Sequence, residues 1–205
     1  MHLTTITAEA KKLLPKFKRF PQFTLVGGTS LALQLGHRKS VDLDWFTEKS
    51  LPRNLHQQVL KVFGPLIKSP EVKNNRELTL EIDGVKVTFF SYAFVFSQQP
   101  IIWQGLPLAG VADIGVMKAY IFGQRITFRD YVDLYFILKS KAASLDWIIN
   151  KTKKIYKDQF HARLFLEQIL NPEDIPAGKI DFLQEPVSKE QIRKFFENLV
   201  KTVKI

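Results

Sequence analysis

Cysteine is absent from the 205 residues, and the four histidines show no close pairing along the chain. The lack of cysteine excludes disulfide bonds, thiolate zinc sites and a cysteine nucleophile, and it is compatible with a reducing cytoplasm. The spacing of the histidines disfavours a transition-metal site built on imidazole ligands. Any metal ion that this chain binds is therefore expected on oxygen ligands.

Long apolar runs are also missing. No stretch reaches the roughly 20 consecutive apolar residues that span a bilayer, and the first residues, MHLTTITAEAKKLLPKF, lack a secretory apolar core. We therefore expect a cytoplasmic protein with no membrane segment. With 45% hydrophobic residues, the chain can bury one substantial core, or a medium core beside a smaller helical domain.

Basic residues are in excess, 30 against 20 acidic ones, so the net charge is +10. Clustered cations attract phosphate and release counterions from nucleic acid, but solubilising lysine explains such a balance equally well. Two dense basic runs stand out: Lys11, Lys12, Lys16, Lys18 and Arg19, then Lys151, Lys153, Lys154 and Lys157. They favour RNA over a small molecule as a partner, although an acidic protein would fit them too.

The spacing of apolar residues changes near residue 108. Upstream, helical patterns alternate with strand-like runs, and Asp83-Gly84 between two such runs is typical of a type I′ hairpin turn. Downstream the spacing is helical throughout, and Ser188 with Gln191 forms a capping box that opens the last helix. We predict an α+β fold, with an α/β core at 1–107 and a helical domain at 108–205. The individual predictions are helices at 7–14, 29–35 and 53–63, strands at 23–26, 41–46, 77–82 and 85–90, and connections at 98–107 and 171–186.

Asp42 and Asp44 lie in the predicted strand at 41–46. Because alternate side chains of a strand share a face, the two carboxylates should project together, while Val41, Leu43 and Trp45 point to the buried side. A divalent cation offsets the repulsion between such carboxylates, and magnesium prefers these hard ligands together with phosphate oxygens. An exposed polar strand face is the alternative interpretation, since Asp-x-Asp is a short pattern.

A glycine pair precedes the helix predicted at 29–35. Gly27 and Gly28 permit close approach to the backbone, and Thr29 or Ser30 is expected to cap the helix. The free N–H groups and the positive dipole end of such a helix bind phosphate. Taken separately, each residue is equally typical of a tight turn or an ordinary cap. Their combination with the nearby aspartates predicts a nucleotide site.

The segment from Gly27 to Phe46, GGTSLALQLGHRKSVDLDWF, resembles without gaps the signature of AbiEii/AbiGii-type nucleotidyltransferase toxins. ADIGVMK at 112–118 and RDYVDLYFIL at 129–138 resemble later segments of that family, in the same order. The resemblance extends over about residues 23–140, and only helical character agrees beyond it. It implies a polymerase-beta-like nucleotidyltransferase domain, a small mixed sheet flanked by helices, followed by a helical C-terminal region. It also implies the toxin role in a toxin-antitoxin pair.

The same resemblance implies a role for each matching residue. Asp42 and Asp44 would hold magnesium, and Gly28 with Thr29 or Ser30 would receive the triphosphate.

Further along the chain, Lys118 would neutralise charge on the donor phosphates or pyrophosphate, and Asp130 would position or activate the acceptor. Without the resemblance, Lys118 is typical of a lysine that reaches solvent, and Asp130 of a capping box with Thr127. Asp133 is then expected to hold a neighbouring backbone or an arginine. Arg38 is a further candidate for a phosphate contact.

Thr88 departs from the usual pattern of this fold. Many such enzymes place a third carboxylate on a later strand, where it bridges metal ions and can deprotonate an acceptor hydroxyl. Thr88 occupies the corresponding position, and a neutral hydroxyl cannot replace a carboxylate as a strong ligand or base. Of the nearest acids, Asp83 is expected in the turn and Glu81 opposite Lys86.

Two hypotheses follow. One is a magnesium-dependent enzyme that transfers a nucleotide from a nucleoside triphosphate to an acceptor, with RNA such as transfer RNA ranked above a small molecule. The other is a catalytically degenerate module that binds nucleotide, RNA or a partner protein such as an antitoxin. We favour the enzyme, because the phosphate turn and both strand aspartates are intact. Nucleotide binding that is equally strong without magnesium would favour the module.

Overall fold

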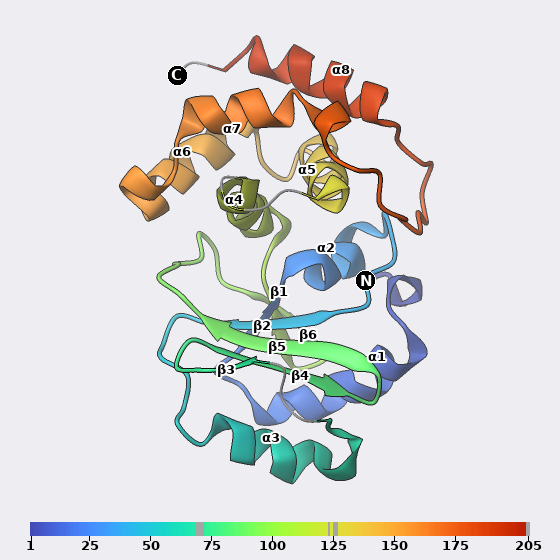
Figure 1. Cartoon of the computed structure of the whole chain (residues 1–205), viewed down its shortest axis with the longest axis vertical. Coiled ribbons are helices and arrows are strands. Elements are labelled where there is room, and N and C mark those ends of the chain that lie inside the picture. The colour runs from blue at the N-terminus through green and yellow to red at the C-terminus, as the bar shows by residue number, and fades with distance from the viewer. Residues whose placement is uncertain (69–71, 123, 125–126, 204–205) are drawn as a thin grey trace. The chain divides into compact units, whose positions relative to one another are not determined.

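The computed structural model describes residues 1–68, 72–122, 124 and 127–203. The chain divides into two compact units, Met1–Gly110 and Val111–Ile205. The first unit holds a mixed sheet in the order β3-β4-β5-β2-β1-β7-β6, and the second is built from helices (Figure 1). The predicted α+β class, with a mixed sheet and a helical C-terminal region, is confirmed.

The sheet places β2 at its centre. β2 runs antiparallel to β1 and parallel to β5, and this register sets Asp44 beside both Val26 and Thr88. β4 and β5 form the predicted hairpin, in which Asp83 and Gly84 have φ values of 50° and 76°, as a type I′ turn requires. The strands are β1 Thr24–Val26, β2 Leu43–Thr47, β3 Val72–Lys73, β4 Glu77–Ile82, β5 Val85–Ser91, β6 Ile101–Trp103 and β7 Leu106–Leu108.

The helices predicted for the first unit are confirmed, with shifts at their ends. The side chain of Thr7 accepts a hydrogen bond from the backbone of Ala10 and so caps α1. Gly36, at φ 66°, ends α2 in the left-handed conformation that glycine adopts without strain. The helices of this unit are η1 Leu3–Thr5, α1 Ala8–Leu13, η2 Leu14–Arg19, α2 Gly27–Leu35, α3 Leu55–Phe63 and η3 Gly64–Leu66.

The main core lies on one face of the sheet, between the sheet and α1, η2 and α3, while α2 lies on the opposite face (Figure 1). Trp45 of β2 is fully buried there, and its ring stacks on Phe17 with centroids 4.4 Å apart. Complete burial of a large apolar side chain contributes about 1.5–3 kcal/mol, so this face holds β2 firmly in place. The alternation of side chains then turns Asp44 and Thr88 toward the other face.

The segment predicted as a connection at 98–107 instead contains β6 and most of β7, which pair as a hairpin. Gln104 and Gly105 form its turn with φ values of 49° and 78°. Each strand has only three residues. So short a segment shows no period-two pattern that would distinguish a strand from a connection in the sequence. The prediction was therefore wrong over this stretch.

The second unit contains α4 Val111–Phe122, α5 Phe128–Lys139, α6 Leu145–Tyr156, η4 Lys157–Gln159, α7 Ala162–Ile169, η5 Pro172–Asp174 and α8 Lys189–Val200. α4 packs against α5, α6 and α7. The predicted capping box at the start of α8 is present, with Ser188 and Gln191 bonded reciprocally. Among the residues that the structure describes, no helix is both long and apolar enough to cross a membrane.

Candidate active site

The first turn of α2 begins directly after β1. Its first residue is Gly27, at φ 66°, and the preceding residue, Val26, makes no side-chain hydrogen bond that caps the helix. The prediction that Thr29 or Ser30 caps it is wrong, because the helix starts two residues earlier and buries both side chains in its first turn. Thr29 donates to the carbonyl oxygen of Asp42, and Ser30 Oγ donates to the carbonyl oxygen of Ala109 at 3.0 Å. In this turn, only Gly27 and Gly28 are partly exposed, so the surface that a ligand could reach is their backbone.

Asp44 lies against this turn. Its Oδ2 atom is so close to Gly27 that a Cβ atom on that residue would lie 2.7 Å away, shorter than Cβ contacts in real proteins. Gly27 therefore allows a half-buried carboxylate to approach the helix start, where the N–H groups of the first turn and the positive dipole end favour anions.

Asp42 precedes β2 rather than lying in it. The strand begins at Leu43, and Val41 is 50% exposed, so the predicted burial of Val41 is wrong. The reason is that the chain at Asp42 is bonded to Thr29 of α2 instead of to a neighbouring strand. From Leu43 onward the predicted alternation holds, with Leu43 and Trp45 fully buried.

Asp42 and Asp44 supply the hard oxygen atoms that magnesium prefers. Within the described ranges, no group of three histidine, cysteine or acidic side chains stands close enough to enclose a metal ion. Magnesium sites commonly use only one or two carboxylates and complete the shell with substrate phosphates and water. The Asp44 carboxylate fits such a site, with Asp42 two residues away as the second candidate ligand and a bound nucleotide to complete the coordination.

Arg38 covers the second glycine. A Cβ atom on Gly28 would lie 2.6 Å from Arg38 Nη2, and Nη1 donates to the carbonyl oxygen of Lys39 at 2.8 Å. The side chain is only 4% exposed. A carboxylate and a guanidinium thus lie against consecutive glycines at the start of one helix. Arg38, which the sequence offered as a candidate for a phosphate contact, is thus buried beside the start of α2.

Thr88 of β5 lies beside Asp44 in the parallel register of β2 and β5. On its other side, Thr79 of β4 lies with its hydroxyl 3.3 Å from that of Thr88, and Thr79 donates to Glu77 Oε1 at 2.7 Å. Glu77 is therefore linked to Thr88 through a buried hydroxyl, a connection that the sequence analysis missed.

Asp83 and Glu81, the acids nearest to Thr88 along the chain, have other structural roles. Asp83 is in the hairpin turn, as expected. Glu81 lies opposite Lys86 in the register, as expected, and forms an ion pair with Lys68 at 2.5 Å.

In the second unit, Lys118 joins α4 to α5. Its Nζ atom lies 2.7 Å from Asp130 Oδ1 and 2.7 Å from Asp133 Oδ2. The side chain of Lys118 is buried rather than directed to solvent, and Asp133, which is fully buried, forms an ion pair with it. Asp130 Oδ2 also accepts from the backbone and hydroxyl of Thr127, which confirms the capping box.

The electrostatics keep Lys118 charged. Burial lowers the pKa of this ammonium group, but the negative charges of Asp133 and Asp130 and their hydrogen bonds outweigh burial and raise the pKa above its ordinary value. The three side chains therefore form a buried ionic network within the second unit.

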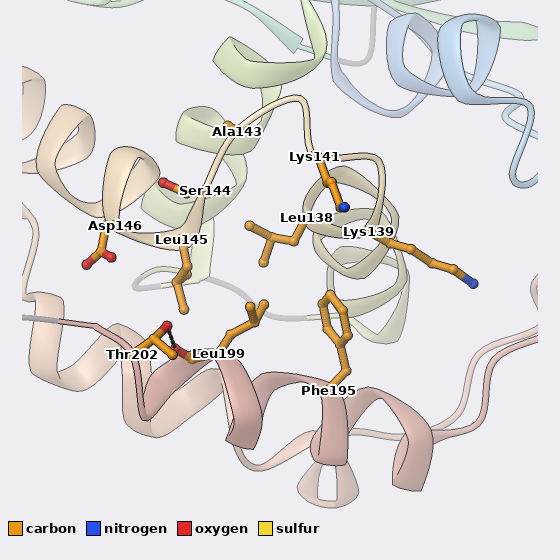
Figure 2. Close-up of a pocket in the computed structure, with 10 residues that line it drawn as sticks. All are labelled: Leu138, Lys139, Lys141, Ala143, Ser144, Leu145, Asp146, Phe195, Leu199 and Thr202. Carbon is orange, nitrogen blue, oxygen red and sulfur yellow. Dashed lines mark hydrogen bonds between the residues drawn. The ribbon is translucent and has the colours of Figure 1, made fainter.

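A hollow of about 510 Å³ lies in the second unit between α5, the start of α6 and α8 (Figure 2). Leu138, Leu145 and Leu199 point toward its middle. Its remaining lining residues are Lys139, Lys141, Ala143, Ser144, Asp146, Phe195 and Thr202. It contains none of the predicted site residues, so the candidate chemistry does not lie in this hollow.

Comparison with known proteins identifies a matching family. The family described as "Nucleotidyl transferase AbiEii toxin, Type IV TA system" matches residues 11–204. An uncharacterized protein of Aquifex aeolicus (strain VF5) is 28% identical over 182 residues, which cover 87% of this chain and 86% of that protein.

Solved structures resemble the chain in fold. A putative nucleotidyltransferase from H. pylori superposes with a TM-score of 0.57 at 18% identity and covers 94% of each chain. MenT4, a nucleotidyltransferase toxin from Mycobacterium tuberculosis, has a TM-score of 0.54 at 21% identity, over 88% of this chain and 76% of its own.

Proposed function

Because this chain belongs to the AbiEii family of nucleotidyltransferase toxins, we propose that it transfers a nucleotide from a nucleoside triphosphate to RNA, using magnesium held by Asp42 and Asp44. The observation that carries this proposal is the position of the Asp44 carboxylate against Gly27 at the open start of α2. A phosphate-binding helix end and a metal-binding oxygen are thereby brought together in one unit.

The donor triphosphate binds at the first turn of α2. The backbone N–H groups near Gly27 and Gly28 donate to its phosphate oxygens, and Arg38 adds positive charge beside Gly28. Thr29 and Ser30 act through their hydrogen bonds to Asp42 and Ala109, which hold the turn in place. Magnesium, when bound, supplies Lewis-acid charge that stabilises the developing negative charge on the phosphoryl oxygens.

The reaction is an in-line attack of an acceptor hydroxyl on the α-phosphorus with release of pyrophosphate. The chain positions the donor and stabilises charge, and no covalent enzyme intermediate is needed. By resemblance to the family, Lys118 stabilises charge on the donor phosphates or pyrophosphate and Asp130 positions the acceptor.

RNA, such as transfer RNA, is the acceptor that the charge distribution supports best. All five basic side chains of the first run, on α1 and η2, are exposed, while Leu13 and Phe17 between them face the core. A cationic surface of this kind binds the phosphate backbone without sequence preference. The toxin family further implies a cognate antitoxin in the same cytoplasmic compartment.

The competing function is a degenerate module that binds nucleotide without transferring it, and Thr88 in place of a carboxylate favours it. Calorimetric titration of each nucleoside triphosphate, with magnesium and with EDTA, separates the two. The enzyme predicts binding at least about tenfold tighter with magnesium, and loss of that difference in Asp44→Asn, because the metal joins the carboxylates to the triphosphate. Equal affinity under both conditions supports the module.

A further inference from the structure

Aromatic side chains gather where β2 and β5 end, on the face of the sheet that carries Asp44. The ring of Phe46 is central, with its centroid 5.0 to 5.9 Å from the centroids of four other rings. Those rings are Phe90 of β5 and, in the segment that follows it, Tyr92, Phe94 and Phe96.

The five rings differ in exposure. Phe46 and Phe94 are each 1% exposed, whereas Phe90, Tyr92 and Phe96 are only half-buried. Phe90 and Tyr92 lie with their planes 5° from parallel and their centroids 5.7 Å apart. The buried rings therefore anchor the cluster, while three others retain aromatic surface that is open to a ligand.

The cluster continues directly from the carboxylate site. In the parallel register of β2 and β5, Asp44 pairs with Thr88, and the next pair on the same face is Phe46 with Phe90. Two residues of a strand span about 6.6 Å, so the rings begin roughly one sugar's length from Asp44, the proposed metal ligand. A nucleotide whose phosphates lie at the first turn of α2, beside Asp44, can direct its base toward the rings.

Exposed aromatic faces are a usual means by which proteins hold unpaired nucleotides, because every base has a π face that can stack on them.

We propose that Phe90, Tyr92 and Phe96 form a stacking platform for a nucleobase beside the carboxylate site. The proposal rests on the proposed function, which places a phosphate beside Asp44. The base belongs either to the donor triphosphate or to the end of the RNA acceptor, and both offer the same π face. Stacking accepts any base, so the platform holds a nucleotide in place without selecting its identity.

Binding of matched probes with and without a base tests the platform, since it does not depend on turnover. One pair is ATP and ribose 5′-triphosphate, titrated by calorimetry with magnesium. The other is a short single-stranded RNA and the same RNA with abasic 3′-terminal nucleotides, followed by fluorescence anisotropy. In at least one pair, the parent protein should bind the base-containing probe about 5- to 100-fold more tightly.

The double variant Phe90→Leu, Tyr92→Leu should lose that preference, because leucine keeps apolar volume but has no π face. Tyr92→Phe keeps the ring and should retain the preference. Val95→Ala is the matched control on the same segment, since Val95 is 65% exposed and carries no ring. It should bind all four probes like the parent.

Preference in the triphosphate pair assigns the platform to the donor, and preference in the RNA pair assigns it to the acceptor. Equal binding of both members in both pairs overturns the platform, as does a preference of the parent's full size in the folded double leucine variant. Failure of nucleotide transfer is a separate result, because a binding preference remains measurable in a protein that transfers nothing.

Discussion

The Oδ2 atom of Asp44 occupies the space that a side chain on Gly27 would need, with only 2.7 Å between that oxygen and an added Cβ atom. Gly27 and Asp44 are separated along the chain by most of α2, yet they lie against each other where β1 ends and α2 begins. This contact joins the proposed metal ligand to the proposed phosphate site, so small changes at Gly27 should affect chemistry more than folding.

Gly27→Ala should lower transfer activity about 100-fold, because the methyl group displaces the Asp44 carboxylate by about an ångström. It should also reduce the free energy of unfolding by about 1–2 kcal/mol, because Gly27 has a left-handed φ of 66°. Activity assays and urea denaturation measure the two effects separately.

Gly84→Ala is the matched control for Gly27→Ala. Gly84 also has a positive φ, 76°, but nothing lies within 4 Å of an added Cβ atom. It should show a similar loss of stability with nearly unchanged activity. Equal activity losses in the two variants would show that the contact with Asp44 has no catalytic importance.

Local chemistry explains what the sequence predicted well. The β4-β5 hairpin follows from Asp83-Gly84, and the burial of Leu43 and Trp45 follows from strand alternation. The family resemblance, including the segment that carries Asp44, is also confirmed.

What the sequence did not predict depends on distant parts of the chain. The early start of α2 requires Gly27 in a left-handed conformation beneath Asp44. The partner of Lys118 depends on how α4 packs on α5, and a lone lysine on a helix shows no sign of it. The three-residue strands β6 and β7 become strands only by pairing with each other and with β1.

Lys118→Met should destabilise the protein by about 3–5 kcal/mol, because it leaves the buried carboxylates of Asp130 and Asp133 without their cation. The measurement is the urea midpoint of unfolding at neutral pH. Lys154→Met removes an exposed lysine from α6 and serves as the control, with an expected change below about 0.5 kcal/mol. A stable Lys118→Met protein that has lost activity would assign Lys118 to catalysis alone.

Tyr131 should make the protein less stable at high pH. Burial, together with the charge of Asp174, raises the pKa of its hydroxyl from 10.0 to about 12. The neutral hydroxyl therefore contributes stability that is complete below pH 10 and is lost as the pH rises through 12. Tyr131 also donates to the carbonyl oxygen of Gln168 at 2.6 Å.

Tyr131→Phe should accordingly be about 1 kcal/mol less stable at pH 8, and its stability should fall less steeply than that of the parent above pH 10. Urea unfolding at pH 8, 10 and 11 measures both. Parallel curves for parent and variant over that range would contradict the assignment.

Thr88→Asp should create the third carboxylate that many enzymes of this fold use. Without magnesium, three nearby negative charges should lower the melting temperature, and magnesium should raise it by binding the folded state. Thr88→Asn has a similar shape without the charge and should respond to magnesium no more than the parent protein does. If Thr88→Asp melts at the same temperature with and without magnesium, position 88 does not face the metal site.

The most direct test incubates the protein with each labelled nucleoside triphosphate, magnesium and total transfer RNA, beside the variant Asp42→Asn, Asp44→Asn. The account predicts label on RNA with the parent protein and at least about 100-fold less with the variant, because the proposed metal ligands are lost. Circular dichroism confirms that the variant is folded. Equal labelling by the two proteins, or no transfer by the parent with any triphosphate and acceptor RNA, would contradict it.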